Sequence, residues 1–419
     1  MTSRERIEAT CNHKQPDKLA VDCGSGCVTG MHATIVYKLR QAFGLDAPGT
    51  PVKIVEPYQM LGEVALDLRD ALGIDTVPLA GTGTMFGFPV KEFKPWTFHD
   101  GTPLLVPIGF NTDPEPNGDI YQWPDGDKSV SPSGHMPAGG YFFDSIIRQP
   151  PFDEDNLNPE DNTEEFVPLE EDEIEHYARM ANKLHQETDR ALYCTLGGLG
   201  FGDIAEVPAS SLKYPKGIRD VEEWYVSTAI RKDYVKAVFE KQAEIALGNL
   251  ERLHTAVGGK ISVIQTNGTD FGTQKGPFLS VENYREVFLP HQKKINGWIH
   301  KNTNWKTFMH CCGGIWPLLD SIVEAGFDIL NPVQCSAAGM DPRELKKNYG
   351  DKLTFWGGGV DTQRVLPFGT PAEVRDQVRE RIDIFAPHGG FVFCAIHNIQ
   401  ARTPLENVLA MFKAIREYR

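Results

Sequence analysis

The chain has 419 residues, of which 41% are hydrophobic, so it can bury a large core and is neither disordered nor a small disulfide-stapled fold. Its formal net charge of −15 argues against nucleic-acid binding and against anchoring to anionic lipid. No apolar run is long enough to span a membrane, and residues 1–8 are charged and unlike a secretory signal, so we expect a cytoplasmic protein.

Short apolar or β-branched runs alternate with helical patterns along the chain. Strand, short loop and helix, repeated eight times, is typical of an α/β fold of the (β/α)₈ TIM-barrel type. A doubly wound sheet is the alternative, because periodicity does not show whether a sheet closes. We expect residues 1–419 to form a single barrel domain. The predicted strands are 19–23, 74–79, 191–196, 261–266, 305–311, 328–333, 353–356 and 390–396.

Residues 80–150 do not follow this alternation. Turn signals at Asp100-Gly101, Asn117-Gly118 and Asp125-Gly126 separate short apolar segments, which predicts β-hairpins. Because this insert, about residues 80–170, follows the second strand, a barrel would place it above the C-terminal face. It is either a lid or substrate wall, or a packing or dimer-forming element. Its aromatic residues are Trp96, Phe98, Phe110, Tyr121, Trp123, Tyr141, Phe142 and Phe143.

The segment from Asp153 to Glu175 holds twelve Asp or Glu residues and no Lys or Arg. Without it the net charge would be about −3, so most of the excess acid lies in this one segment. A solvated connector is the simpler interpretation, and an acidic strip that docks a partner is the alternative. Residues 213–219 are predicted to form a loop.

Three later helices have clear start signals with one layout. Each begins with a capping side chain, then Pro at the first helical position, then Glu two residues later. Apolar residues follow at helical spacing. The three starts are Asp341-Pro342-Arg343-Glu344, Thr370-Pro371-Ala372-Glu373 and Thr403-Pro404-Leu405-Glu406.

The sharpest chemical signal is His310-x-Cys312 at the end of the fifth predicted strand. On a strand, residues i and i+2 face the same side, so an imidazole and a thiolate would project together. Zinc accepts both ligands. The alternative is a buried cysteine that packs beside a hydrogen-bonded histidine. Cys394 could be the third metal ligand, and Cys335 and His397 are its rivals.

Other polar residues also follow the predicted strands, where a barrel carries its active site. Asp270 could orient a substrate or act as an acid or base, and a turn-capping role is the alternative. Gln334 could be a metal ligand or a hydrogen bonder behind one. We predict catalytic roles for Asp270 and His397, and substrate contacts for Asp22, Asn267, Gln274 and Gln334.

Several of these pieces together resemble the uroporphyrinogen decarboxylase superfamily, whose fold is a (β/α)₈ barrel. The resemblance covers about residues 15–75 and 260–419. The pieces are Pro16-Asp17-Lys18 with Val21-Asp22-Cys-Gly-Ser, Asp270-Phe-Gly-Thr-Gln, His310-x-Cys312-Gly, and His397-Asn-Ile-Gln with Thr403-Pro404-Leu405-Glu406-Asn407.

The superfamily contains true decarboxylases and zinc methyltransferases that exchange methyl groups with corrinoid proteins. The decarboxylases carry an Arg-rich N-terminal motif, and this chain has Asp22-Cys-Gly-Ser-Gly at that place, which disfavours porphyrinogen decarboxylation. In the methyltransferases a His-x-Cys pair and a later Cys hold zinc, and His310 and Cys312 fit the pair. The family spacing would put the later ligand nearer His397 than Cys394.

The resemblance therefore implies a zinc-dependent methyltransferase. The enzyme would move a methyl group between a small methylated substrate, such as a methoxy compound, and a corrinoid carried by a partner protein. A homodimer is a further expectation, because related barrels often dimerise. One alternative is a metal-free decarboxylase or other lyase that uses Asp270 and His397. Another is a barrel that binds a tetrapyrrole or a metabolite without turnover.

Overall fold

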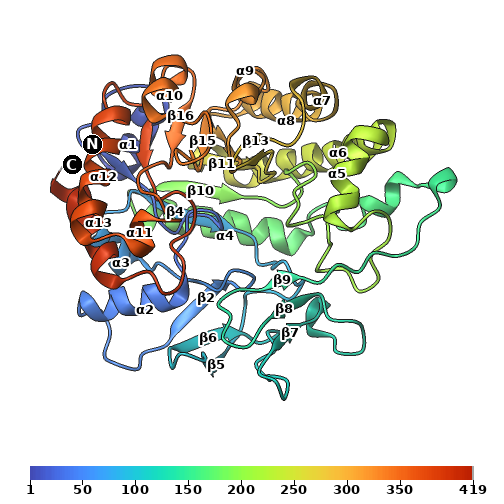
Figure 1. The fold of residues 1–419 in the computed structure, drawn as a ribbon, viewed down its shortest axis with the longest axis horizontal. Helices are drawn as coiled ribbons and strands as arrows, with labels where there is room; N and C mark the ends of the chain where they lie inside the picture. Colours follow the sequence, from blue (N-terminus) through green and yellow to red (C-terminus); the bar gives the residue numbers. More distant parts are fainter. Residues whose placement is uncertain (418–419) are drawn as a thin grey trace.

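The computed structural model describes residues 1–417, and its main feature is one parallel sheet of eight strands. Each of the eight predicted strands overlaps one of them, and the sheet curls into a nearly closed barrel, which confirms the (β/α)₈ prediction (Figure 1). In spatial order the strands are β4 (Thr76–Ala80), β10 (Ala191–Thr195), β11 (Ile261–Asn267), β14 (Lys306–His310), β15 (Ile329–Asn331), β16 (Thr354–Trp356), β17 (Phe391–Phe393) and β1 (Ala20–Val21).

A buried aspartate joins the two ends of this sheet. The Asp75 backbone N–H donates to the Val21 carbonyl at 2.8 Å, and the Val21 N–H donates to Asp75 Oδ2 at 3.0 Å. Arg6, on helix α1 (Ser3–Cys11), pairs with Asp75 Oδ1 at 2.6 Å, and both side chains are almost fully buried. Because the seam between β1 and β4 is short, this side chain supplies bonds that a longer strand ladder would provide.

The barrel interior is filled by alternate residues of the strands. Tyr193, Phe308 and Trp356 pack there as one buried cluster, while Leu192 and Cys194 belong to the outer core beneath the helices. This is the period-two pattern of a strand with both faces buried. Ile7 and Cys11 of α1 join the interior cluster, so α1 contributes to its packing.

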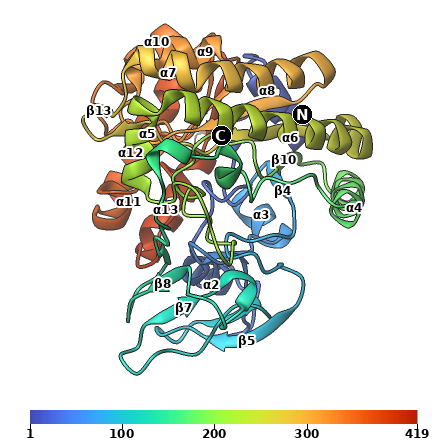
Figure 2. The same cartoon turned by 90° about the vertical axis from the view of Figure 1, so that its right-hand side faces the viewer.

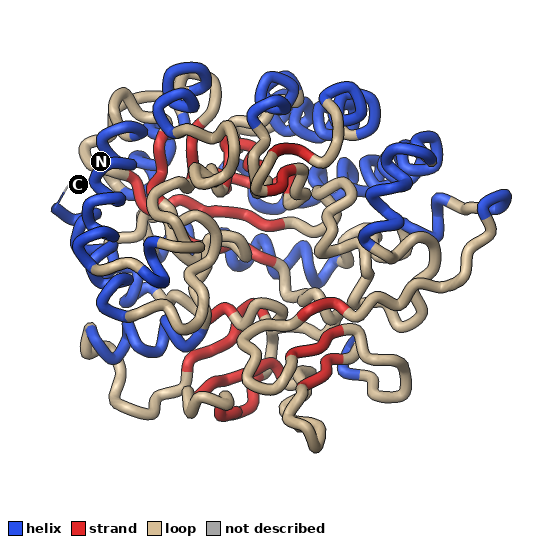
Figure 3. Tube along the Cα trace, viewed as in Figure 1, coloured by secondary structure: helices blue, strands red, loops and turns tan. Residues whose placement is uncertain are grey.

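Helices follow the strands and cover the outside of the barrel (Figure 3). The chain thus alternates in the order expected for a right-handed βα barrel. The helices after α1 are α2 (Ala33–Ala42), α3 (Leu66–Leu72), α4 (Glu171–Glu187), α5 (Val221–Ile230), α6 (Lys232–Val257), α7 (Val281–Val287), α8 (Leu289–Asn302), α9 (Leu319–Glu324), α10 (Pro342–Tyr349), α11 (Val365–Phe368), α12 (Pro371–Phe385) and α13 (Leu405–Glu417).

Two of the three predicted helix caps form as expected. Asp341 accepts the first free N–H groups of α10, and Thr370 makes a reciprocal capping box with Glu373 at the start of α12. The third helix, α13, also begins at the predicted place. There, however, the Thr403 hydroxyl donates to the Gln400 carbonyl at 2.8 Å.

The predicted insert contributes to two small sheets beside α2, one mixed and one antiparallel, at one end of the molecule (Figures 1 and 2). A turn at Gly101, whose φ is +88°, joins two of the strands, as the Asp-Gly signal predicted. The first sheet also includes two strands that precede the second barrel strand and that were not predicted from the sequence. The first sheet has the order β3 (Leu61–Gly62), β2 (Val52–Glu56), β6 (Pro103–Pro107), β5 (Phe93–Thr97), and the second β7 (Ile120–Gln122), β8 (Gly134–Met136), β9 (Asp144–Ser145).

Several aromatic residues of the insert form its own core. Phe98, Phe110 and Phe143 are fully buried, and their rings lie edge-on or tilted against each other and against Trp96 and Tyr141. Such contacts stabilise a small sheet that has little other apolar surface. Because these rings are buried within the insert, their arrangement favours a packing role over a role as a lid above the site.

Most acidic side chains of the acidic segment are exposed, as expected for a solvated connector, and about half of them also pair with basic residues of neighbouring elements. Residues 213–219 form a loop, as predicted. Among residues 1–417, no helix combines the length and the apolar character that a membrane span requires. The ion pairs of the segment are Glu154 with Arg231, Glu160 with Lys241, Glu164 with Lys216, Glu165 with Arg219, Glu171 with Arg252, and Asp172 with Lys91.

Candidate metal centre

His310 enters the site because of its place on β14. Phe308 faces the barrel interior, so His310, two residues later, faces the same side at the C-terminal end of the strand. In the ladder His310 lies opposite Asn331, the last residue of β15. The ends of two neighbouring strands therefore put an imidazole and an amide side by side at the mouth of the barrel.

A chain of hydrogen bonds fixes which nitrogen of His310 carries a proton. Asn331 Nδ2 donates to the Trp356 carbonyl at 2.6 Å, which leaves Oδ1 of Asn331 as an acceptor. His310 Nδ1 lies 2.6 Å from this oxygen and donates to it. The lone pair of Nε2 is then directed into the site, which is the usual state of a histidine that binds a metal.

Cys312 lies at the point where this lone pair is directed. Its Sγ atom is 3.4 Å from His310 Nε2, and its backbone N–H donates to Asp270 Oδ1 at 2.6 Å. Burial, followed by the negative charge of Asp270, raises the pKa of Cys312 well above its usual range. Without a metal the thiol therefore keeps its proton and can donate it to His310.

His397 completes the group. Ligand atoms of His310, Cys312 and His397 lie within 4.8 Å of one another. His397 has a φ of +70°, an uncommon conformation for a residue with a side chain and one that often marks functional sites. Its Nδ1 accepts the Asn398 N–H at 2.8 Å, and burial lowers its pKa to about 3. At neutral pH the ring is neutral, and in this orientation its Nε2–H is a hydrogen-bond donor.

The donor set fits a divalent cation such as zinc. Tetrahedral zinc bonds of the usual length put a nitrogen and a sulfur ligand about 3.5 Å apart, close to the 3.4 Å between His310 Nε2 and Cys312 Sγ. Within residues 1–417 no Lys or Arg lies at ion-pair distance from Asp270, and His310 is 3.7 Å away. A dication would offset the charges of Asp270 and of a Cys312 thiolate. His397 is near enough to be a third ligand once its Nε2 or Nδ1 is free.

The other cysteines that the sequence offered lie elsewhere. Cys394 is fully buried in the interior cluster with Tyr193 and Trp356, so it is not part of the metal group. His397 occupies the place in the group that was predicted for Cys394. Cys335 lies on the far side of its loop, 3.3 Å from the Val333 carbonyl. Cys311 belongs to the outer core, because it follows the inward-facing His310.

Two residues expected to bind substrate are held within the protein. Asp22 is 1% exposed and accepts hydrogen bonds from Thr76 at 2.6 Å and from the Trp356 indole at 3.0 Å. Asn267 is also 1% exposed, and its amide donates to the His310 carbonyl at 3.0 Å and accepts from Gln292. Both placements favour a structural role over the predicted substrate contact.

Gln334 and Gln274 support the turn that carries Cys312. Gln334 Oε1 accepts the Gly313 N–H at 2.9 Å, and its Nε2 donates to Gln274 Oε1 at 3.1 Å. The turn packs against the loop after β11, because a Cβ on Gly313 would lie 2.3 Å from the Gly272 carbonyl carbon. Gly313 thus lets the two loops touch, and Gln334 stands behind the turn.

Three further residues shape the site and were not predicted from the sequence. Asn331 sets the proton position on His310, and Asn398 ties the end of β17 to the loop after β1 through bonds to the Cys27 carbonyl and the Gly30 N–H. Asp203 approaches the same loop as Asp270 from the β10–α5 connection. A polar residue directly after each strand was the available signal for Asn331. Asp203 lies eight residues beyond its strand, so strand ends alone gave no signal for it.

Comparison with known proteins supports this description. The sequence model of uroporphyrinogen decarboxylase (URO-D) matches residues 209–418, half of the chain. The uroporphyrinogen decarboxylase of Alcanivorax borkumensis is 26% identical over 196 residues, 44% of this chain and 52% of that protein. That of Aromatoleum aromaticum is 26% identical over 151 residues, 34% of this chain and 39% of that protein. The chain thus spans about half the length, or less, of these curated relatives.

Among solved structures, a methyltransferase from Methanosarcina mazei superposes with a TM-score of 0.57. The superposition covers 100% of this chain and 99% of that one, at 16% sequence identity. At this identity the likeness concerns the fold, and it agrees with the barrel described above. The family match extends from the loop before α5 through the last five barrel-strand positions, and includes His310, Cys312 and His397. The chain belongs to the uroporphyrinogen decarboxylase family.

Proposed function

We propose that this protein is a zinc-dependent methyltransferase. The observation that carries the proposal is the His310–Cys312 pair, in which the Nε2 lone pair of one residue is directed at the sulfur of the other at 3.4 Å. His397 lies close enough to serve as the third ligand. Three protein ligands with a position left for substrate are typical of catalytic rather than structural zinc.

Each residue of the site has a defined task in this proposal. His310 and Cys312 bind the metal, and Asn331 keeps His310 in the tautomer that binds. Asp270 holds the backbone of Cys312 in place at 2.6 Å. Zinc in such a site lowers the pKa of a bound thiol or polarises a bound oxygen. His397 is either the third ligand or, with its Nε2–H, a donor to the substrate.

The methyl group would move between a small methylated substrate, such as a methoxy compound, and a corrinoid on a separate protein. The likeness to a methyltransferase over the whole chain supports this choice of reaction. A donor with a methoxy oxygen suits the site, because the oxygen that loses the methyl group gains negative charge near the metal.

Metal content is the first test. Purified protein should hold about one zinc per chain by elemental analysis, and His310→Ala and Cys312→Ala should lose it. Cys394→Ala is the matched control, since this cysteine is buried outside the group and should leave zinc in place. Loss of zinc in His397→Ala identifies a third ligand, and retained zinc with lost activity identifies a hydrogen-bond donor. Protein that neither contains nor binds zinc contradicts the proposal.

A second experiment separates methyl transfer from the other candidate activities. Zinc-loaded protein is incubated with cob(I)alamin and a methoxy-aromatic donor, and formation of methylcobalamin is followed by absorbance. The curated relatives are decarboxylases, so the same protein is also assayed with uroporphyrinogen. Decarboxylation that continues in Cys312→Ala would favour a metal-free lyase. Binding without either reaction would favour the non-catalytic alternative.

A further inference from the structure

The loop between β10 and α5 brings a carboxyl group next to the metal centre. It packs over the loop after β11, where the Thr269 hydroxyl donates to the Phe201 carbonyl at 2.8 Å. Asp203 lies against Gly268 so closely that a Cβ added there would be 2.2 Å from Asp203 Oδ2. Two residues after Gly268 comes Asp270, which holds Cys312. Asp203 is therefore built into the wall beside the proposed reaction site.

A second carboxyl group lies on the same turn. The backbone N–H groups of Glu206 and Val207 both donate to the Asp203 carbonyl at 2.9 Å. Glu206 Oε2 is buried and has no hydrogen-bond partner among residues 1–417. Arg219 lines the same cavity but is already engaged, because it makes a two-pronged ion pair with Glu165 at 2.6 and 3.1 Å. Nothing in this turn compensates a charge on Glu206.

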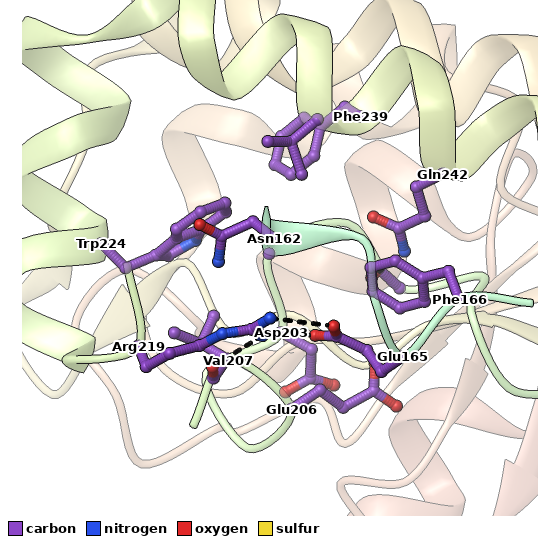
Figure 4. Close-up of a pocket in the computed structure, with 13 residues that line it drawn as sticks. Asn162, Glu165, Phe166, Asp203, Glu206, Val207, Arg219, Trp224, Phe239 and Gln242 are labelled. Atoms are coloured by element: carbon purple, nitrogen blue, oxygen red, sulfur yellow. Dashed lines mark hydrogen bonds and ion pairs between the residues drawn. The ribbon is translucent and has the colours of Figure 1, made fainter. Parts of the chain in front are cut away.

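The two carboxyls line a small cavity of about 20 Å³. Figure 4 shows them beneath the Arg219–Glu165 pair, with Trp224 among the other lining residues. Trp224 is 2% exposed, and its indole N–H has no partner in the described part of the chain. A cavity of this size accommodates one water molecule. Such a molecule can accept from the indole and donate to a carboxylate.

The surroundings of Asp203 and Glu206 favour the protonated form of these carboxyl groups. Burial raises the pKa of Asp203 to about 6 and that of Glu206 to about 8, and the charge of Asp203 adds to the shift of Glu206. Two carboxyls this close titrate as a pair. The other titratable and charged groups that face them are Asp270, His310, Cys312, Glu165, Arg219, Cys27 and Tyr225.

We propose that Asp203 and Glu206, with one water molecule in the cavity, form a proton store for the barrel site. Glu206 holds the proton away from solvent, and Asp203 exchanges it at the wall beside Asp270. This assignment rests on the proposed methyl transfer, in which either a methoxy oxygen must gain a proton or a thiol must lose one.

The proton balance is the same in both directions. In the resting pair Glu206 carries the proton and Asp203 is a carboxylate. When the methyl group passes from an oxygen to the corrinoid and the C–O bond breaks, Glu206 passes its proton through the water molecule to Asp203, Asp203 gives it to that oxygen, and solvent restores Glu206. When a thiol is the methyl acceptor, Asp203 takes the thiol proton and passes it through the water molecule to Glu206, which has released its own proton to solvent.

The stored proton can be measured without activity. A carboxyl whose folded-state pKa is raised stabilises the protein below its unfolded pKa, and the stability is lost as the pH rises through the folded pKa. Glu206→Gln mimics the protonated acid. We expect it to leave Tm unchanged at pH 5 and to raise it by about 2–4 °C at pH 8.5.

The control is Asp155→Asn, which removes an exposed acid from the connector and should shift Tm equally at both pH values. Asp203→Asn is the second test variant. The amide keeps an oxygen for the Ala205 N–H that Asp203 Oδ1 accepts at 3.0 Å, so the turn should hold. If the effect of Glu206→Gln on Tm is the same at pH 5 and pH 8.5, Glu206 stores no proton and the proposal is overturned.

The link to the reaction is tested with zinc-loaded protein. Asp203→Asn should lower kcat about 100-fold with little change in KM, and Glu206→Gln should move the pH profile of kcat. Equal kcat and an unchanged profile in both variants would overturn the relay, even where methyl transfer itself is observed. If no methyl transfer occurs in any variant, the proposed function fails, and the Tm comparison still decides whether the pair holds a proton.

Discussion

Asn331 determines how His310 can act, although it would not touch a metal itself. Its amide orientation is set by the Trp356 carbonyl, and it accepts the Nδ1 proton of His310 at 2.6 Å. Replacing such a partner commonly lowers metal affinity 10- to 100-fold. We therefore expect Asn331→Ala to weaken zinc binding by about 10- to 100-fold, measured by competition with a chelator of known affinity.

The matched control for Asn331 is another buried asparagine. Asn296 on α8 donates to the Ala325 carbonyl at 2.9 Å and accepts from Thr266, away from the site. Asn296→Ala should lower stability, because buried polar groups lose their partners, and it should leave zinc affinity unchanged. Similar zinc affinities in the two variants would show that Asn331 acts through general stability alone.

Residue identities in the metal group were only partly predictable. The strand period correctly put His310 and Cys312 together, because residues two apart share a face. The third member depended on where the chain turns after β17. Cys394 still faces the interior like Val392 before it, and the positive φ of His397 turns that residue toward the group. Strand periodicity carries no information about such a turn, so Cys394 was preferred, although the family spacing already pointed nearer to His397.

At the scale of an element, the turn after β14 depends on a glycine. Gly313 has a φ of +90°, and a Cβ there would lie 2.3 Å from the Gly272 carbonyl carbon. Ala in a left-handed conformation costs about 1–2 kcal/mol, and overpacking adds about 1–3 kcal/mol. We expect Gly313→Ala to lower the free energy of unfolding by about 2–5 kcal/mol in urea titrations, and to weaken zinc binding.

Gly101 provides the comparison, since it has nearly the same φ, +88°, with no atom within 4 Å of an added Cβ. Gly101→Ala carries the conformational cost without the clash, so it should lose only about 1–2 kcal/mol and keep its zinc. Equal losses for both glycines would mean that the contact between the two loops contributes nothing.

The barrel strands were predictable as elements, because each is a short apolar run followed by a helix pattern. The strands β2 and β3 were not, although the residues from Val52 to Glu56 form a β-compatible run. They lie where the barrel rule places only a loop and a helix, and their partner β6 is some fifty residues further on. The alternation of residues along a strand shows which side chains face the core, but it does not show which other strand pairs with it. The pairing of β2 with β6 could therefore not be derived from the sequence.

At the scale of the whole molecule, most of the net charge of −15 comes from the acidic segment, and nearby basic residues compensate part of it. The segment pairs with Arg219, Arg231, Lys216 and Arg252, which lie after β10. These pairs attach the segment to α5, α6 and the loop before them. The charge of the segment is therefore separate from that of the metal centre, where Asp270 and Cys312 are the acidic groups.

The pair between Glu165 and Arg219 is the strongest point of this attachment. Arg219 is 0% exposed and Glu165 is 14% exposed, and they meet at 2.6 Å. Removing one partner of a buried pair leaves an uncompensated charge and costs about 3–5 kcal/mol. We expect Glu165→Gln to lower the free energy of unfolding by about that amount, and to expose residues 150–170 to limited proteolysis.

Glu154→Gln tests whether burial of the ion pair is the reason for the large stability loss expected in Glu165→Gln. Glu154 lies in the same segment and also pairs with an arginine, Arg231, but it is 60% exposed, so its loss should cost about 0–1 kcal/mol. The double change Glu165→Gln with Arg219→Met should recover part of the stability, because no unpaired charge then remains inside. If Glu165→Gln costs no more than Glu154→Gln, the segment is held by its apolar contacts, and the buried pair is not what fastens it to the barrel.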